Sequence, residues 1–358
     1  MRADPDERQA DLVAAVDRTA AEGGTALEIM ARLGGERLLA VHYPESHGGR
    51  GLRLADHAAV CERIGALGLP DVAHLITVQA VGCTILEYGT EEQRTRWLPE
   101  IAAGRLFASL LLSEQTAGSD LAGIQTSAVP DRSGWRISGT KTWSLFTGWS
   151  GLALVSARTR EGTHRYDGIS LFLLDPSSPG VTITPVPRAA GEPFRTVTMD
   201  EVRVGPDALL GPLHHGWRLL PTAIGFERAG FDYLTCATRW LAAIENEVRG
   251  LSGERQQDMA TDLLRLRFEV DNARAFAYHA VNSAERFDMD EVTAAYAKLA
   301  CGRAAQSVAR WAGIELHSGS ATVRSAVAEA PEFTISGGAQ ELQLDLIATE
   351  YPIGKVMR

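Results

Sequence analysis

The hydrophobic period of the sequence changes twice, and this change constrains the fold more than any other feature. Up to about residue 98, apolar residues recur at the three- and four-residue spacing of amphipathic helices. From about residue 106, short runs of β-forming residues alternate with Gly, Pro, Asp and Ser. Helical spacing then returns in three long stretches, near 222–249, 254–284 and 290–315. The pattern predicts an α+β multi-domain fold: N-terminal helices, a middle β domain and a C-terminal helical bundle.

The 358 residues are enough for two or three domains. We place the boundaries at 1–104, 105–213 and 214–358. The middle domain has no helix of crossover length, which favours an antiparallel sandwich or barrel over a parallel sheet. In the first domain, Thr90 and Gln93 have the spacing of a capping box at the start of a helix. The expected strands of the middle domain are Leu106–Leu112, Trp135–Ser138, Leu152–Ala157, Ile169–Leu174, Val181–Thr184 and Thr196–Met199.

Composition excludes several classes of function. The formal net charge is -10 and there are no runs of Lys and Arg, so we expect no nucleic-acid binding. The apolar runs are too short to span a bilayer and the N-terminus lacks a secretory segment, so we expect no membrane partner and a cytoplasmic location. No metal motif is present, so no metal is expected. The cysteines are far apart and predict reduced, buried thiols: Cys61, Cys83, Cys236 and Cys301.

Several segments, in order and in suitable spacing, resemble the acyl-CoA dehydrogenase family. The most specific is Ser113-Glu-Gln-Thr-Ala-Gly-Ser-Asp120, which is similar to the family's Thr-Glu-Pro-x-Ala-Gly-Ser-Asp signature. Others are Tyr43-Pro-Glu-Ser-His-Gly-Gly-Arg-Gly-Leu52, Tyr88-Gly-Thr-Glu-Glu-Gln93, Gly139-Thr-Lys-Thr-Trp143 and Phe226-Glu-Arg228. One such segment would be weak support, whereas the set in register is specific.

The resemblance implies a flavoprotein oxidoreductase with a C-terminal four-helix bundle. Such a protein uses FAD to oxidise an acyl thioester, of coenzyme A or of an acyl carrier protein, to the α,β-enoyl thioester. A carboxylate removes the α-proton and the β-hydrogen leaves as hydride. The electron acceptor would be an electron-transfer flavoprotein or oxygen, and the chain would form a homo- or hetero-oligomer.

The resemblance also implies which residues contact the cofactor. Leu112 and Ser113 would contact the pyrimidine side of the flavin, and Trp143 would lie against its ring system, although a Trp at the end of a β run is more often a core residue. Ser119 would meet the acyl or pantetheine part of the substrate, or only cap a turn. The sequence departs from the family at Leu145, where a hydroxyl residue is usual. Near Gly319, Glu315 stands where the family has a glutamine. The resemblance therefore implies a carboxylate close to the anionic diphosphate of FAD, which is unfavourable.

The base is the third departure from the family. Most members carry it in a C-terminal segment that here reads Ile335-Ser-Gly-Gly-Ala-Gln-Glu-Leu-Gln343, with Gly337 at the glutamate position. Gly337 could only donate its N–H to the thioester carbonyl. A minority of members carry the base before an arginine on the first long C-terminal helix, which implies Glu227 as base and Arg228 as a pocket residue. The alternatives are a solvated Glu-Arg pair, or Glu341 as a displaced base.

Two other functions remain open at this stage. A flavin-dependent monooxygenase on the same fold would need no α-proton base. A non-catalytic subunit of a hetero-oligomeric dehydrogenase would fit the changed cofactor contacts.

Overall fold

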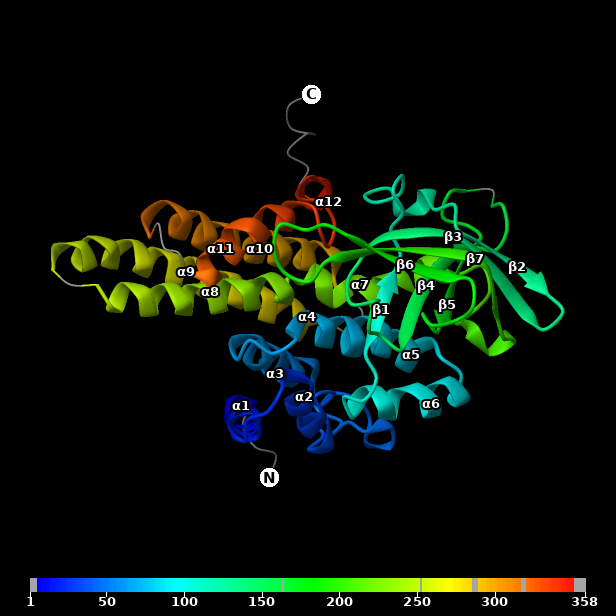
Figure 1. Ribbon diagram of the computed structural model, residues 1–358, viewed down its shortest axis with the longest axis horizontal. Coiled ribbons are helices and arrows are strands. Elements are labelled where there is room, and N and C mark those ends of the chain that lie inside the picture. The colour runs from blue at the N-terminus through cyan, green and yellow to red at the C-terminus, as the bar shows by residue number, and fades with distance from the viewer. Residues whose placement is uncertain (1–4, 163, 252, 285–288, 317–319, 351–358) are drawn as a thin grey trace. The chain divides into compact units, whose positions relative to one another are not determined.

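The computed structural model describes residues 5–162, 164–251, 253–284, 289–316 and 320–350, apart from the side chain of residue 226. The chain divides into two compact units, and each is described by itself. The first unit contains residues 1–57, 72–188 and 192–224, and the second contains residues 58–71, 189–191 and 225–358. The order of elements confirms the predicted fold class: helices first, then a β domain, then a helical region (Figure 1).

The N-terminal region is helical, as its period predicts. A π-helical segment, Leu75–Gly82, links α4 to α5. The predicted capping box is present, with Thr90 Oγ1 accepting from the N–H of Gln93 at 3.2 Å and Gln93 Oε1 accepting from the N–H of Thr90 at 2.9 Å. The helices are α1 Pro5–Ala21, α2 Ala26–Gly35, α3 Leu54–Ala66, α4 Asp71–His74, α5 Cys83–Tyr88 and α6 Glu91–Ala102.

The middle domain is one eight-stranded sheet with the order β6-β7-β3-β2-β4-β5-β8, to which β1 is added beside β4. The sheet is mixed rather than purely antiparallel, because β1 pairs with β4 in parallel. One face of it packs on a core that includes Leu111, Ile137, Val155, Phe172 and Val197. The strands are β1 Ala108–Leu111, β2 Ser127–Asp131, β3 Gly134–Ser144, β4 Leu152–Arg158, β5 Ile169–Leu174, β6 Val181–Val186, β7 Phe194–Val204 and β8 Leu209–Leu210.

The C-terminal region is helical, and its helices α8, α9 and α10 pack against one another along their lengths (Figure 1). The single helix expected over 222–249 was wrong in one respect, because the chain breaks at Gly230. That residue has φ 74°, and a Cβ there would lie 2.9 Å from the Cβ of Cys301 and 3.1 Å from the Cα of Lys298. Only glycine combines this backbone angle with such close packing. The helices are α7 Leu220–Arg228, α8 Phe231–Arg249, α9 Glu254–Ser283, α10 Glu291–Glu315, α11 Ala321–Glu329 and α12 Gln340–Glu350.

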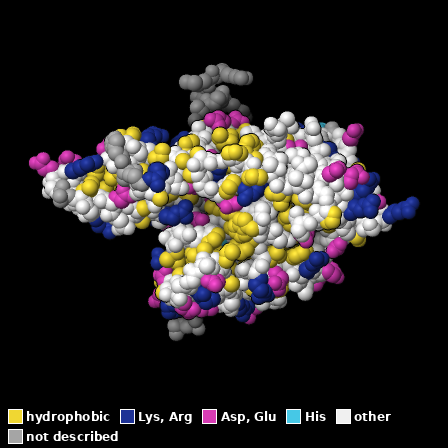
Figure 2. Space-filling view, viewed as in Figure 1, with side chains coloured by type: hydrophobic (Ala, Val, Ile, Leu, Met, Phe, Trp, Pro, Cys, Tyr) yellow, Lys and Arg dark blue, Asp and Glu magenta, His cyan; other side chains and the backbone are white. Residues whose placement is uncertain are grey.

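Two further expectations concern the cysteines and the surface. All four cysteines are buried, free thiols, as predicted. Among the described residues, no helix combines the length and the apolar character needed to cross a bilayer. On the face seen in Figure 2, basic and acidic side chains are interspersed with apolar ones.

Candidate active site

The expected cofactor segment of the first unit joins the end of β1 to β3. Leu112 and Ser113 directly follow β1, and the N–H of Thr142 in β3 donates to the carbonyl of Ser113 at 2.9 Å. Ser113 is half-buried, whereas Leu112 is buried. This bond holds Ser113 close to Trp143, the next residue of β3.

A buried ion pair holds this segment. Lys141 Nζ donates to the carboxylate of Glu114 at 2.9 Å, to the carbonyl of Leu112 at 3.0 Å and to Ser156 Oγ at 3.2 Å. The Glu114 carboxylate also accepts the N–H groups of Gln125 and Thr126, at 2.8 and 2.9 Å. Burial lowers the pKa of Lys141 to about 8, although Glu114 opposes that change. The ion pair of Lys141 with Glu114 therefore holds the segment that follows β1 in place.

Trp143 is exposed at an irregularity of β3. Between Lys141 and Ser144 the register with β7 shifts by one residue, and Trp143 has φ 63°. A bulge turns a side chain out of the alternation of its strand. Its indole is 53% exposed and meets Phe194 edge-to-face, with ring centroids 6.0 Å apart. It is therefore not a core tryptophan, the alternative that the sequence left open, and presents a flat aromatic surface.

The other expected contacts in this unit are less complete. Ser119 is exposed in a loop. The next residue, Asp120, forms an ion pair with Arg165. Leu145 is half-buried and has no hydroxyl to offer. The nearby hydroxyls of Ser144 and Thr147 are buried and bonded to each other at 2.9 Å, so they do not replace the one that is missing.

The donor set of the first unit fits the isoalloxazine end of FAD. Ser113 supplies a half-buried hydroxyl, and Trp143 supplies an exposed stacking surface beside it. Both suit a flat heteroaromatic ring with polar edges. The expected diphosphate contact, Gly319, lies outside the described residues.

In the second unit, the structure brings Glu227 and Gly337 together. Glu227 is half-buried in the last turn of α7, and Gly337 has φ 62° in the turn before α12. A Cβ built on Gly337 would lie 3.4 Å from Glu227 Oε1 and 2.8 Å from the hydroxyl of Tyr233. The carboxylate of Glu227 therefore lies beside the position from which a side chain at 337 would extend.

Burial raises the pKa of the Glu227 carboxyl above its usual value, although Arg228 and Lys298 oppose the change. Asp232, in the first turn of α8, is a second acid of this cluster. Burial and the charge of Glu227 raise the pKa of Asp232 well above its usual range. Its Oδ1 is buried and accepts no hydrogen bond from the described residues. Arg228 turns toward Glu291, with an N–O distance of 3.4 Å.

Sequence reasoning missed three residues of this cluster. Lys298 in α10 is 1% exposed, Tyr233 in α8 is equally buried, and Asp232 joins them electrostatically. The signal for Lys298 was a lone lysine within an alanine-rich stretch. Glu341 is exposed at the start of α12, which makes it a poor candidate for a base that must act in a desolvated site.

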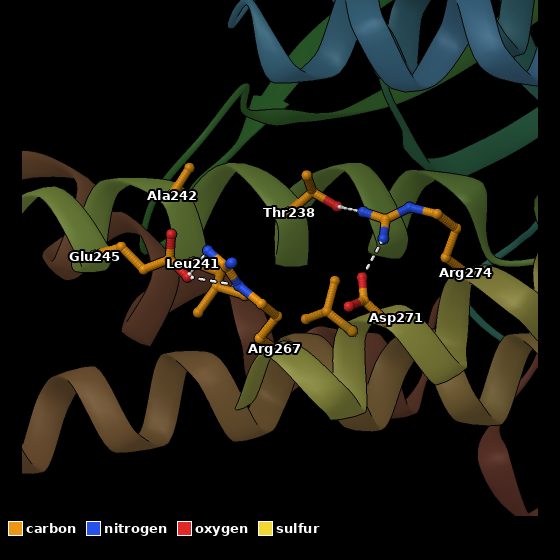
Figure 3. A pocket seen from close by; sticks show the side chains of 8 residues that line it. Thr238, Leu241, Ala242, Glu245, Arg267, Asp271 and Arg274 are labelled. Carbon is orange, nitrogen blue, oxygen red and sulfur yellow. Dashed lines mark hydrogen bonds and ion pairs between the residues drawn. The ribbon is translucent and has the colours of Figure 1, made fainter. Parts of the chain in front are cut away.

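A cavity of about 300 Å³ between α8 and α9 is a separate feature of this unit (Figure 3). Its arginines are already paired, Arg267 with Glu245 at 2.6 Å and Arg274 with Asp271 and Thr238. Since these cations are neutralised by neighbouring groups, the cavity has no unpaired charge with which to hold an anionic ligand. We therefore assign no chemistry to it.

Comparison with known proteins identifies the family. The model of the acyl-CoA dehydrogenase N-terminal domain matches residues 6–105, that of the middle domain residues 109–202, and that of the C-terminal domain residues 214–351. These matches cover most of the chain, and the chain belongs to the acyl-CoA dehydrogenase family.

Curated relatives and solved structures agree with this assignment. Acyl-CoA dehydrogenase IpdE1 of Mycobacterium tuberculosis is 35% identical over 198 residues, which are 55% of this chain and 51% of that protein. Acyl-CoA dehydrogenase FadE26 of the same organism is 30% identical over 63% of this chain and 56% of its own length. The chain thus spans about half the length of these curated relatives. Butyryl-CoA dehydrogenase of Megasphaera elsdenii has the same fold, with a TM-score of 0.84 at 20% identity over 100% of both chains.

Proposed function

We propose that this protein oxidises an acyl thioester to the α,β-enoyl thioester, with FAD as cofactor and Glu227 as the base. The thioester is carried by coenzyme A or by an acyl carrier protein. An electron-transfer flavoprotein or oxygen reoxidises the cofactor, and the active form is a homo- or hetero-oligomer.

One observation carries the proposal. The resemblance gives two alternative positions for the base, and in this chain one holds Gly337 and the other Glu227. Glu227 Oε1 lies 3.4 Å from the point where a side chain at Gly337 would begin. This distance supports Glu227 as the carboxylate that replaces the one the C-terminal segment lacks.

In the proposed reaction, Glu227 and Gly337 have different roles. The α-proton of the thioester passes to a carboxylate oxygen of Glu227, and the electrons of that C–H bond form the new double bond as the β-hydrogen leaves as hydride. The N–H of Gly337 donates to the thioester carbonyl and stabilises the negative charge that develops there. When bound, FAD supplies the acceptor for the hydride. Burial raises the pKa of Glu227 and so makes it a stronger base once it is ionised.

The leading test is Glu227→Gln, which keeps the size of the side chain and removes the proton acceptor. We expect enoyl formation to fall about a hundredfold to ten-thousandfold, the usual contribution of a general base. Butyryl-CoA, palmitoyl-CoA and the same acyl groups on a carrier protein serve as substrates with ferrocenium as acceptor. Mass spectrometry records the loss of two hydrogens.

Glu254→Gln is the matched control, because it makes the same change at an exposed position at the start of α9, outside this cluster. It should retain the wild-type rate to within about threefold, as a surface substitution does. If Glu227→Gln forms enoyl product at the wild-type rate, Glu227 is not the base. If it instead forms a hydroxylated product as fast as wild type does, the protein is a monooxygenase.

Cofactor binding is tested separately by the visible absorption spectrum of the purified protein before and after incubation with FAD. A stable flavin spectrum supports the contacts assigned to Ser113 and Trp143. A protein that stays colourless would contradict both enzymatic functions for the isolated chain, and size-exclusion chromatography with candidate partner subunits would then test a non-catalytic role.

A further inference from the structure

A buried lysine beside the proposed base has no part in the mechanism above. Lys298 lies in α10, and its Nζ donates to the carbonyl of Phe333 at 3.2 Å and to the carbonyl of Gly338 at 2.7 Å. Its side chain is 1% exposed. A charged lysine is seldom buried so completely unless neighbouring groups compensate for the lost hydration.

The two carbonyls flank the turn that contains Gly337. A third contact holds the same turn, since the hydroxyl of Tyr233 lies 2.9 Å from Ser336 Oγ. Lys298 Nζ also lies 5.5 Å from the centre of the Tyr233 ring, a cation–π distance. The backbone at Gly337 and Gly338 is left-handed, with φ of 62° and 92°. Lys298 and Tyr233 thus fix a turn whose conformation few other residues adopt.

The charge of Lys298 is balanced by carboxylates. Burial lowers the pKa of Lys298, and Asp232, Glu227 and Glu341 oppose that change. In return, Lys298 favours the ionised form of Glu227, as Arg228 does. The charge of Arg228 is shared with Glu291, with which it is paired. Lys298 contributes a second cation to the cluster, from α10. The titratable and charged groups around Glu227 and Lys298 are Arg228 from α7, Asp232 and Tyr233 from α8, Glu291 from α10 through its pair with Arg228, and Glu341 from α12 beside Lys298.

We infer that Lys298 is a positioning residue for the proposed dehydrogenation: it holds the N–H of Gly337 in place, and its charge favours the ionised form of Glu227. The inference rests on the proposed function of Glu227. It assigns two separable effects to one side chain, a hydrogen-bonding effect on the turn and an electrostatic effect on the base.

Two substitutions separate these effects. Lys298→Gln keeps a donor for the carbonyls and removes the charge, whereas Lys298→Met removes both. Arg303→Gln, which removes an exposed cation from the same helix, is the matched control. The rate of enoyl formation from butyryl-CoA or palmitoyl-CoA is measured against pH for each variant.

Without the cation, the pKa of Glu227 rises, so ionised base becomes scarcer at low pH. For Lys298→Gln we expect the rate to fall at least about fivefold at about pH 6 and less than about twofold at about pH 9. Lys298→Met should lose a further factor of about ten at every pH, because the turn is no longer held and a small misplacement slows a reaction strongly. Arg303→Gln should keep the wild-type profile. A folded Lys298→Gln protein with the wild-type profile would overturn the inference.

A second measurement does not depend on activity or on the folding of the lysine variants. The sequence has only three lysines, Lys141, Lys298 and Lys355, so ¹³C-lysine labelling gives a spectrum that is simple to assign. Coupling between two charges is reciprocal, so in Glu227→Gln the titration of Lys298 should move to lower pH than in wild type. An unchanged titration would refute the coupling. If the wild-type protein forms no enoyl product but this coupling is present, the proposed function is wrong. The electrostatic coupling of Lys298 with Glu227 is then still supported.

Discussion

Lys141→Met tests the buried ion pair that anchors the proposed cofactor segment. The Nζ and Oε1 atoms of the pair are 2.9 Å apart, and the two side chains are 0% and 7% exposed. At an effective dielectric constant of about 20, the attraction over that distance is about 6 kcal/mol. Much of it is offset by the cost of removing both charges from water. The stability lost in Lys141→Met therefore measures the cost of leaving the Glu114 carboxylate buried without its cation.

We expect Lys141→Met to lower the free energy of unfolding by about 3 kcal/mol, the lower end for a broken buried pair. The lower end applies because Glu114 keeps the two N–H donors of Gln125 and Thr126. Equilibrium urea denaturation at neutral pH, followed by tryptophan fluorescence, measures the loss. Flavin binding should weaken in parallel, because Lys141 also holds the carbonyl of Leu112.

The pH dependence gives the sign of the effect. In wild type, burial opposes ionisation of Glu114, but Lys141 and the neighbouring donors hold its pKa below the usual value. The stability this contributes is present above the usual pKa of a glutamate and is lost as the pH falls. Without Lys141, burial favours the protonated acid, so the deficit of the variant should shrink as the pH falls toward about 5.

Two controls complete the design. Lys141→Met combined with Glu114→Gln should recover about half of the lost stability, since the double change leaves no buried charge. Arg105→Met removes the cation of an exposed pair with Glu100 and should change stability little. A loss below about 1 kcal/mol for Lys141→Met, or a deficit that grows as the pH falls, would refute this account of the pair.

Two further substitutions probe the second unit and the first helices. Gly337→Ala should cost about 2–4 kcal/mol in urea denaturation, because a left-handed backbone disfavours alanine and the methyl group would press on the Tyr233 hydroxyl at 2.8 Å; a neutral effect would mean that the turn is not fixed. Thr90→Ala removes the cap of α6 and should cost about 1 kcal/mol in the same assay, with Thr90→Ser as the conservative control that retains most of the stability.

Much of the architecture was readable from hydrophobic period. The strands over 152–157 and 169–174 end within a residue of the observed β4 and β5, because their buried runs are bounded by turn residues. Strand β2, Ser127–Asp131, was missed because it contains Pro130, which cannot donate to a ladder and argues against a strand. The break at Gly230 was missed because an isolated glycine in a helical pattern is usually tolerated. Its need for a left-handed backbone arises from the approach of α10, which is a tertiary contact.

The cofactor segment shows a similar division. Its position after β1 followed from the motif around Ser113, and the exposure of Trp143 did not. That exposure depends on a one-residue shift in the register of β3 with β7, between Lys141 and Ser144. The sequence of each strand alone looks regular. A bulge is set by the pairing of two strands, so one strand read alone does not reveal it.

A candidate base could be named from sequence, but its environment could not. Glu227 is one of two positions that the family resemblance offers, and Gly337 at the other left it as the candidate. What makes a carboxylate a base, however, is the balance between burial and neighbouring charge. Here burial raises the pKa of Glu227, and Arg228 from its own helix and Lys298 from α10 oppose that change. A buried lysine in an alanine-rich stretch looks the same in sequence as one that reaches solvent from a helix edge. The carbonyls of Phe333 and Gly338 distinguish the two cases, because they accept the ammonium group inside the protein and tie its charge to the turn beside the base.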